Sequence, residues 1–134
     1  MKTMTSTDSM RKDTALQLDE AEILARLDGD WQLLADLCDL SLTELPRMIQ
    51  SLSEAVKAQD ANAVHRSAHR LKGSLSVFGE GPHTRDCITL EEMALNQDLS
   101  RTQEVLCGLE RHLEQFNAAV DALGKESHAR ADCR

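Results

Sequence analysis

The sequence predicts an all-α fold, an antiparallel four-helix bundle with an additional short N-terminal helix. Aromatic residues make up only 2% of the 134 residues, and the chain holds two prolines and six glycines. That composition favours a helical bundle over a β-sandwich or barrel. Apolar residues also recur every three or four positions, which is the helical period, and no segment has the pattern of a strand.

The short first helix is predicted to begin after Asp19, which forms a capping-box pattern with Glu22. Gly29 can end this helix in the left-handed conformation. Asp30 can then cap a second, much longer helix over residues 31 to about 57.

The second helix is expected to bend along its length. Pro46 lies inside it, where the loss of one N–H predicts a kink. The apolar positions of this helix follow the helical period and are Leu34, Leu37, Leu45, Met48, Leu52 and Val56. A short turn connects this helix to the third. Asp60 is predicted to cap the third helix, which we expect to end near Gly79.

The fourth helix is predicted from Pro82, which suits a first helical turn, to about Asn96. Ser100 and Gln103 form another capping-box pattern that opens the last helix, and Gly124 is predicted to end it. This helix has the most regular apolar stripe, formed by Leu106, Leu109, Leu113, Phe116, Val120 and Leu123.

These elements predict one folded domain over residues 18–123. Residues 1–17 are rich in Thr, Ser, Asp and Lys without an apolar period, so we expect a disordered N-terminal arm. Residues 124–134 have the same polar character, so we expect a flexible C-terminal tail.

The composition argues against several classes of function. A formal net charge of −8 disfavours nucleic acid or an anionic membrane as partner, because both need a cationic surface. No apolar run approaches the roughly 20 residues of a membrane span, and the N-terminus lacks the apolar core of a secretory signal, so we expect a cytoplasmic protein. The four cysteines form no C-x-x-C pair, which predicts buried free thiols rather than a zinc or redox site, with Cys133 in the tail.

The third helix carries the candidate site. Its predicted buried stripe occupies a sector about 80° wide and is formed by Val64, Ala68, Leu71, Leu75 and Phe78. A different sector, roughly 120° away, holds His65, His69, Lys72, Gly73 and Ser76. We therefore expect His69 to be at least partly accessible.

His69 has the surroundings that a phosphorylated histidine needs. Neutral imidazole is a nucleophile near pH 7, and its phosphoramidate can pass the phosphoryl group to a carboxylate. Lys72 can partly neutralise that group, and Arg66 and Arg70 add positive potential from farther round the helix. Gly73, which costs about 1 kcal/mol relative to alanine inside a helix, leaves room for an approaching partner.

The stretch AHRLKGSLSVFG, residues 68–79, resembles the signature of histidine-containing phosphotransfer (HPt) domains. In that signature a histidine is followed by an apolar residue, Lys-Gly and a small residue, with another glycine several residues later. The resemblance runs from about residue 18 to 123. It includes LDEAEILARLDGDWQLLADL at residues 18–37, the long helix and its approach to the site at residues 45–73, and CITLEE at residues 87–92.

The resemblance implies a phosphoryl carrier of a two-component phosphorelay. His69 would accept a phosphoryl group from an aspartyl phosphate on the receiver domain of a sensor hybrid histidine kinase, and would pass it to the receiver domain of a response regulator. Lys72 would stabilise the added charge, and Gly73 would give the receiver access. The protein would have no ATP site, no catalytic cycle and no cofactor of its own, because the receiver supplies Mg²⁺.

The docking face implied by this role includes His65, Arg70 and Ser76 beside His69, together with apolar residues of the second helix. Such contacts are transient, and the bundle can bury its own stripes, so we expect a monomer. Family members often place a polar side chain of the next helix near the imidazole, and Glu91 matches that place. Its carboxylate could accept Nδ1–H and leave Nε2 as the nucleophile, although it would also repel the phosphoryl group.

His83 and Asp86 depart from the family pattern, which has apolar, core-facing residues early in the fourth helix. Two explanations are open: the helix begins late, or the surface beside the site is reshaped for a particular partner. With His112 and His128, His83 is expected to be an ordinary surface or rim residue.

Three other functions fit parts of the pattern. A bundle that is not phosphorylated could dock on a receiver or kinase and inhibit it, although the joint presence of His69 and Lys72 argues against this. His65 and His69 could bind a metal, but the sequence offers no other ligand, so we expect no metal site. The dimerisation and phosphoacceptor domain of a kinase is disfavoured because no ATP-binding domain follows.

Overall fold

The computed structural model describes residues 18–133, which contain five helices. They are α2 (Glu20–Arg26), α3 (Trp31–Lys57), α4 (Ala61–Ser76), α5 (Pro82–Leu95) and α6 (Thr102–Asp132). This part of the chain contains no strand, which confirms the all-α prediction. The predicted N-terminal arm, residues 1–17, lies outside the described residues.

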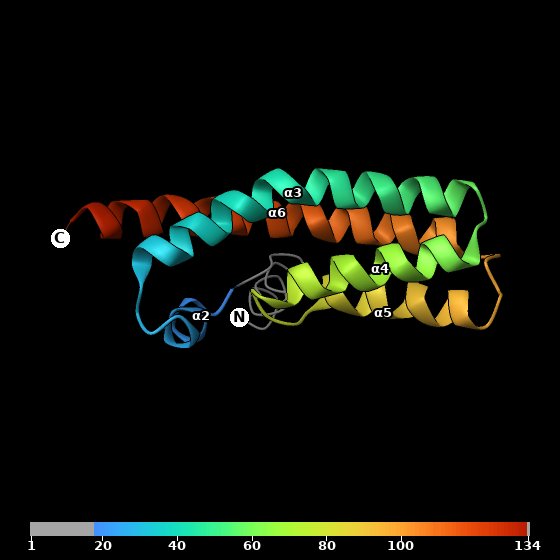
Figure 1. Cartoon of the computed structure of the whole chain (residues 1–134), viewed down its shortest axis with the longest axis horizontal. Helices are drawn as coiled ribbons and strands as arrows, with labels where there is room; N and C mark the ends of the chain where they lie inside the picture. The colour runs from blue at the N-terminus through green and yellow to red at the C-terminus, as the bar shows by residue number, and fades with distance from the viewer. Residues whose placement is uncertain (1–17, 134) are drawn as a thin grey trace, which may run out of the picture.

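Helices α3 to α6 form an up-and-down bundle in which each helix runs antiparallel to the next (Figure 1). The most extensive contacts join α3 to α6 and α4 to α5, and contacts of α3 with α4 and of α5 with α6 close the bundle. The first part of α3 and the last part of α6 extend beyond the ends of α4 and α5, and the short α2 lies at this end (Figure 1). The four-helix part therefore continues into a two-helix extension.

Aspartate side chains cap the N-termini of the first three helices, as predicted. Asp19, Asp30 and Asp60 each accept a hydrogen bond from the backbone N–H three residues later, at 3.1, 3.0 and 3.2 Å. Gly29, with a φ of 76°, lies in the turn that ends α2. Figure 1 shows that α3 changes direction along its length, and Pro46, which has no N–H to donate, lies inside this helix.

The predicted flexible tail of residues 124–134 is wrong in its described part, because α6 continues to Asp132. Gly124 is not a C-cap but a buried residue inside the helix. A Cβ at Gly124 would lie only 3.0 Å from the Cβ of Cys38 on α3. Glycine at this position therefore permits α3 and α6 to approach closely, which a helix-ending role would not require.

The last turns of α6 are held against α3 by several contacts. Ser127 is fully buried. The guanidinium of Arg130 lies 5.0 Å from the ring centroid of Trp31, a cation–π geometry. Nε2 of His128 lies 2.9 Å from a carboxylate oxygen of Asp39. These contacts explain why a polar C-terminal segment is helical.

Two helix boundaries also differ from the prediction. Ser100 does not cap α6: its hydroxyl donates to the Asp98 carboxylate at 2.7 Å, and the helix begins at Thr102. Helix α4 ends at Ser76, and Gly79, with a φ of 111°, lies in the turn before α5.

The cysteines are free thiols, of which two are buried and two exposed. Burial raises the pKa of the Cys38 thiol to about 11 and that of Cys87 to about 12. These two thiols stay protonated and pack as small apolar side chains. The expectation of burial is wrong for Cys107, which is exposed on α6. Cys133 is exposed too, but it follows α6 as its C-cap residue rather than lying in a loose tail.

Candidate functional site

Helix α4 presents its polar face to solvent. The predicted stripe on its other side is buried and consists of Val64, Ala68, Leu71, Leu75 and Phe78. The side chain of His69 is 64% exposed, which confirms the accessibility expected from the helical wheel. The same helix therefore anchors the bundle and displays the imidazole.

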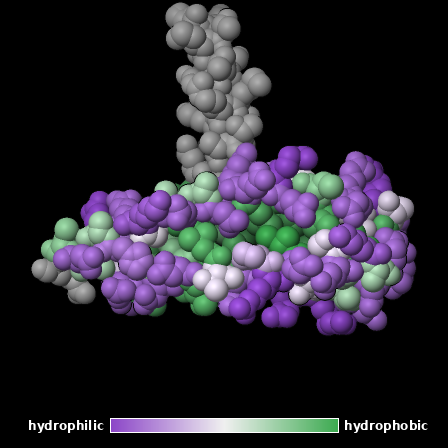
Figure 2. Space-filling view, turned by 90° about the horizontal axis from the view of Figure 1, so that it is seen from above, coloured by the Kyte–Doolittle hydropathy of each residue, from purple (hydrophilic) through white to green (hydrophobic). Residues whose placement is uncertain are grey.

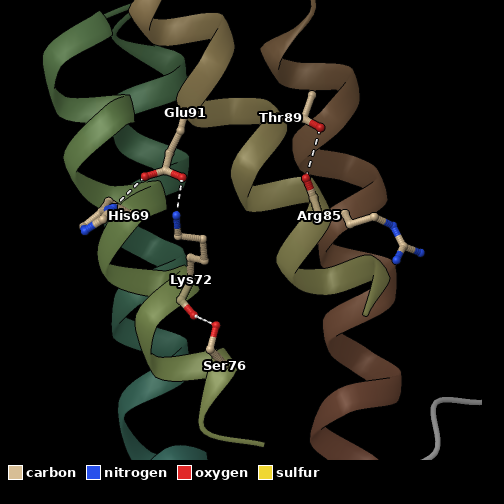
Figure 3. A network of polar contacts seen from close by, with 6 residues as sticks. All are labelled: His69, Lys72, Ser76, Arg85, Thr89 and Glu91. Atoms are coloured by element: carbon tan, nitrogen blue, oxygen red, sulfur yellow. Dashed lines mark hydrogen bonds and ion pairs between the residues drawn. The ribbon is translucent and has the colours of Figure 1, made fainter. Parts of the chain in front are cut away.

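Glu91 of α5 joins the two charged residues of this face. One of its carboxylate oxygens lies 2.7 Å from Nδ1 of His69, and the other accepts a hydrogen bond from Nζ of Lys72 at 2.9 Å. Figure 3 shows both contacts converging on the one carboxylate, which reaches from α5 across to α4. The structure thus brings together three of the residues that the sequence analysis selected.

The electrostatics of Glu91 favour its ionised form. Burial acts to raise the pKa of Glu91, but the hydrogen bonds with Lys72 and His69 outweigh it, so the pKa lies below its ordinary value. An ionised carboxylate only accepts hydrogen bonds, so Nδ1 of a neutral His69 carries the proton. The lone pair then lies on Nε2, the nitrogen that does not face Glu91.

The residues that follow His69 shape the space around it. No atom outside the local helix backbone would lie within 4 Å of a Cβ at Gly73, so the surface beside the imidazole is open. The hydroxyl of Ser76 donates to the carbonyl oxygen of Lys72 at 2.8 Å, within the helix (Figure 3). Ser76 therefore lies on the predicted face, but its hydroxyl hydrogen is already engaged in this hydrogen bond within the helix.

His65 lies one turn before His69 on the same face. The two imidazole rings are nearly parallel, at 11°, with their centroids 6.3 Å apart. Arg66 and Arg70 are exposed on α4. Arg70 also lines a polar groove against α3, together with Arg47.

An apolar groove lies between α3 and the C-terminal end of α4. It has a volume of about 220 Å³, and its lining includes Leu40, Met48, Ser74 and Val77. Leu40 is 57% exposed and Val77 41% exposed, which is high for apolar side chains of a bundle. Figure 2 shows apolar residues gathered near the middle of the face seen from above, among polar ones. Apolar residues of the long helix were expected here from the sequence, but Val77 was not. The sequence feature that points to Val77 is its place outside the buried stripe of α4.

His83 is buried, so the expectation of a surface or rim residue is wrong. The fourth helix does not begin late, because α5 starts at Pro82. His83 instead takes a core position in the first turn, with its ring centroid 4.9 Å from that of Phe116. Burial lowers the pKa of His83, which favours the neutral imidazole.

Asp86 faces away from the candidate site. Its carboxylate lies 2.6 Å from Nδ1 of His112 on α6, whereas Glu91 of the same helix contacts α4. Asp86 therefore does not reshape the surface beside His69. This pair was not expected from the sequence, because its members are 26 positions apart and no local pattern links them.

Within residues 18–133, no group of three or more His, Cys, Asp or Glu side chains is arranged to hold a metal ion. No helix in the same range is long and apolar enough to cross a membrane.

Comparison with protein families gives a match over most of the chain. The family model described as Hpt domain matches residues 32–124, which is more than half of the chain. The matched region holds nearly all of α3, the whole of α4 and α5, and most of α6, including His69 and Glu91. Comparisons with curated proteins and with solved structures gave no match. Hpt domains are helical phosphocarrier modules of two-component systems, and this chain belongs to the Hpt domain family.

Proposed function

We propose that this protein carries a phosphoryl group on His69, accepting it from an aspartyl phosphate of one receiver domain and donating it to the receiver of a response regulator. The observation that carries the proposal is the 2.7 Å contact between Nδ1 of His69 and the carboxylate of Glu91, on an imidazole that is 64% exposed. This contact selects Nε2 as the nucleophilic atom and leaves it accessible.

Transfer to His69 is a displacement at phosphorus. The lone pair of Nε2 forms an N–P bond while the P–O bond to the receiver's aspartate breaks, and the aspartate leaves as a carboxylate. The imidazole ring gains positive charge because Nδ1 keeps its proton, and the neighbouring Glu91 carboxylate stabilises that charge. Attack by an aspartate of the second receiver reverses these steps and restores the neutral ring.

Lys72 and Glu91 act on the phosphoryl group in opposite senses. The carboxylate repels the phosphoryl oxygens, whereas the ammonium attracts them. The 2.9 Å ion pair between Lys72 and Glu91 reduces the repulsion, because the ammonium lies beside the carboxylate that causes it.

The receiver is proposed to dock over Gly73 and the apolar groove between α3 and α4. Leu40 and Val77 offer exposed apolar surface there, and Arg47 and Arg70 lie next to it. We place Mg²⁺ and the acidic residues that bind it on the receiver, so the arginines would face an acidic partner surface. Association would be transient and would not require a second copy of this chain.

The proposal is tested by incubating the protein with a phosphorylated receiver domain and following acid-labile, base-stable phosphate on the chain. We expect label on the wild type and none on His69→Gln. His112→Gln is a matched control, because Nδ1 of His112 also faces a carboxylate, at 2.6 Å, and it should keep the label. Undiminished label on His69→Gln would refute the assignment of the residue.

The same experiment tests the alternative, a bundle that docks on a receiver or kinase and inhibits it without being phosphorylated. The open surface at Gly73 and the apolar groove would serve docking equally well. A wild type that binds receivers but takes no label from any of them would favour this inhibitory role.

A further inference from the structure

Lys72, the lysine that shares Glu91 with His69, is already paired before a phosphoryl group arrives. The carboxylate of Glu91 contacts both His69, at 2.7 Å, and Lys72, at 2.9 Å. A phosphoryl group brings about −1.5 to −2 charges near pH 7. Because the ammonium of Lys72 is already paired, another N–H donor on this face would stabilise the phosphorylated state.

His65 lies where such a donor is needed. Its ring is nearly parallel to that of His69, with the centroids 6.3 Å apart. Side chains of a helix tilt toward its N-terminus, so His69 leans toward the turn that carries His65. The ring of His65 stacks on that of His69. It has no hydrogen-bond partner among the described residues.

The position of His65 also leaves the proposed approach of the receiver open. At about 100° per residue, His65 and Lys72 lie on one side of His69, and Gly73 lies on the other. The side that carries His65 and Lys72 faces α5, because Lys72 binds Glu91 of α5. Arg66, the nearest arginine, falls on the Gly73 side, where the partner would cover it.

We propose that His65 is a phosphoryl-binding residue, whose imidazole donates an N–H to an oxygen of the phosphoryl group on Nε2 of His69. This inference rests on the proposed function of His69. The hydrogen bond would slow hydrolysis, in which water adds to phosphorus, the N–P bond breaks, and inorganic phosphate and neutral imidazole are released. His65 would thus set the lifetime of the phosphorylated carrier.

The test uses the full chain and a small phosphodonor, so that docking plays no part. Phosphoramidate transfers its phosphoryl group to Nε2 of His69 as ammonia leaves, and the decay of phosphohistidine is then followed after the donor is removed. We expect decay roughly tenfold faster in His65→Ala than in the wild type, as for the loss of one hydrogen bond to a charged group. His65→Gln, which keeps an N–H donor, should restore most of the lifetime.

Two controls separate this inference from other effects. His112→Ala removes an imidazole of α6 that pairs with Asp86, away from His69, and should leave the decay unchanged, and helical circular dichroism reports whether each variant is folded. A folded His65→Ala that takes label and loses it at the wild-type rate would overturn the role of His65 alone. If the wild type takes no label on His69 from phosphoramidate or from a phosphorylated receiver, the proposed function itself fails.

Discussion

Gly124 of α6 and Cys38 of α3 approach so closely that a Cβ at Gly124 would lie 3.0 Å from the Cβ of Cys38. Gly73 of α4 is the opposite case, because a Cβ there would meet no atom beyond its own helix backbone within 4 Å. One glycine permits two helices to pack, and the other leaves the surface beside His69 open. The same substitution at both positions therefore separates a packing role from a docking role.

Gly124→Leu is expected to destabilise the bundle. The new side chain must displace Cys38 or move α6 away from α3, and overpacking of this kind costs about 1 to 3 kcal/mol. Urea unfolding followed by circular dichroism measures the loss. A wild-type unfolding midpoint in this variant would contradict the close approach of the two helices.

Gly73→Leu is expected to leave the free energy of unfolding unchanged or to raise it by up to about 1 kcal/mol, because leucine has a higher helix propensity than glycine. Transfer from a phosphorylated receiver should nevertheless slow, since the side chain fills the open surface. Labelling of His69 by phosphoramidate should persist and serves as the control. Full-rate transfer from the receiver would show that this surface is not where the partner docks.

The elements that the sequence predicted well are those whose causes are local. The aspartate caps at Asp19, Asp30 and Asp60 act on N–H groups three residues away, and the apolar stripe of α6 repeats within one helix. The polar face of α4 follows from the same periodicity. The position of Glu91 beside His69 came from a resemblance to a family, and the structure shows the contact.

The errors arose where a distant residue decides the outcome. Gly124 matches a helix end by residue type, and only its contact with Cys38, far away in the sequence, makes it an interior residue. Histidine is a polar residue type, which suggests a surface position, yet the place of His83 in the first turn of α5 directs its ring toward Phe116. A single sequence carries the helical period but not the identity of the neighbour across the bundle.

Removal of residues 125–134 is expected to lower stability, contrary to the behaviour of a flexible tail. The deletion would remove Arg130 from the ring of Trp31 and expose apolar surface of α3. Trp31 is the only tryptophan, so its emission should shift to the red. Arg130→Gln is the milder control, with an expected loss of about 0.5 to 1 kcal/mol for an exposed cation–π contact. Unchanged stability and emission after the deletion would argue against a structural role for this segment.

Glu91→Gln is expected to slow the phosphorylation of His69 by phosphoramidate about tenfold, as for the loss of one charge-assisted hydrogen bond. The amide can donate as well as accept, so it neither fixes the proton on Nδ1 nor balances the charge that develops on the ring. Asp86→Asn makes the same chemical change at the pair with His112 and should leave the phosphorylation rate unchanged. Equal rates in both variants would show that the Glu91 carboxylate does not assist the reaction.

His83→Leu is expected to weaken the dependence of stability on pH below neutrality. Burial lowers the pKa of His83, and the hydrogen bond with the Gly79 backbone and the nearby charges of Glu80 and Asp86 only partly oppose that effect. The folded protein therefore holds this imidazole neutral, whereas an unfolded chain protonates it near pH 6.5. The stability that the neutral His83 imidazole gives the folded state is fully present above the unfolded-state pKa. It is lost as the pH falls toward the lowered folded-state pKa, at up to about 1.4 kcal/mol per pH unit.

The comparison that isolates His83 is the difference in unfolding free energy between pH 7.5 and pH 5.5, measured by urea in the wild type and in His83→Leu. The other four histidines are the same in both proteins, so their own contributions cancel apart from the interaction of the His112 charge with His83. The wild type should lose more than the variant over this range, by at most about 1.4 kcal/mol. Parallel curves would mean that the imidazole binds its proton equally well in the folded and unfolded states, and the buried position beside Phe116 would then not restrict its charge.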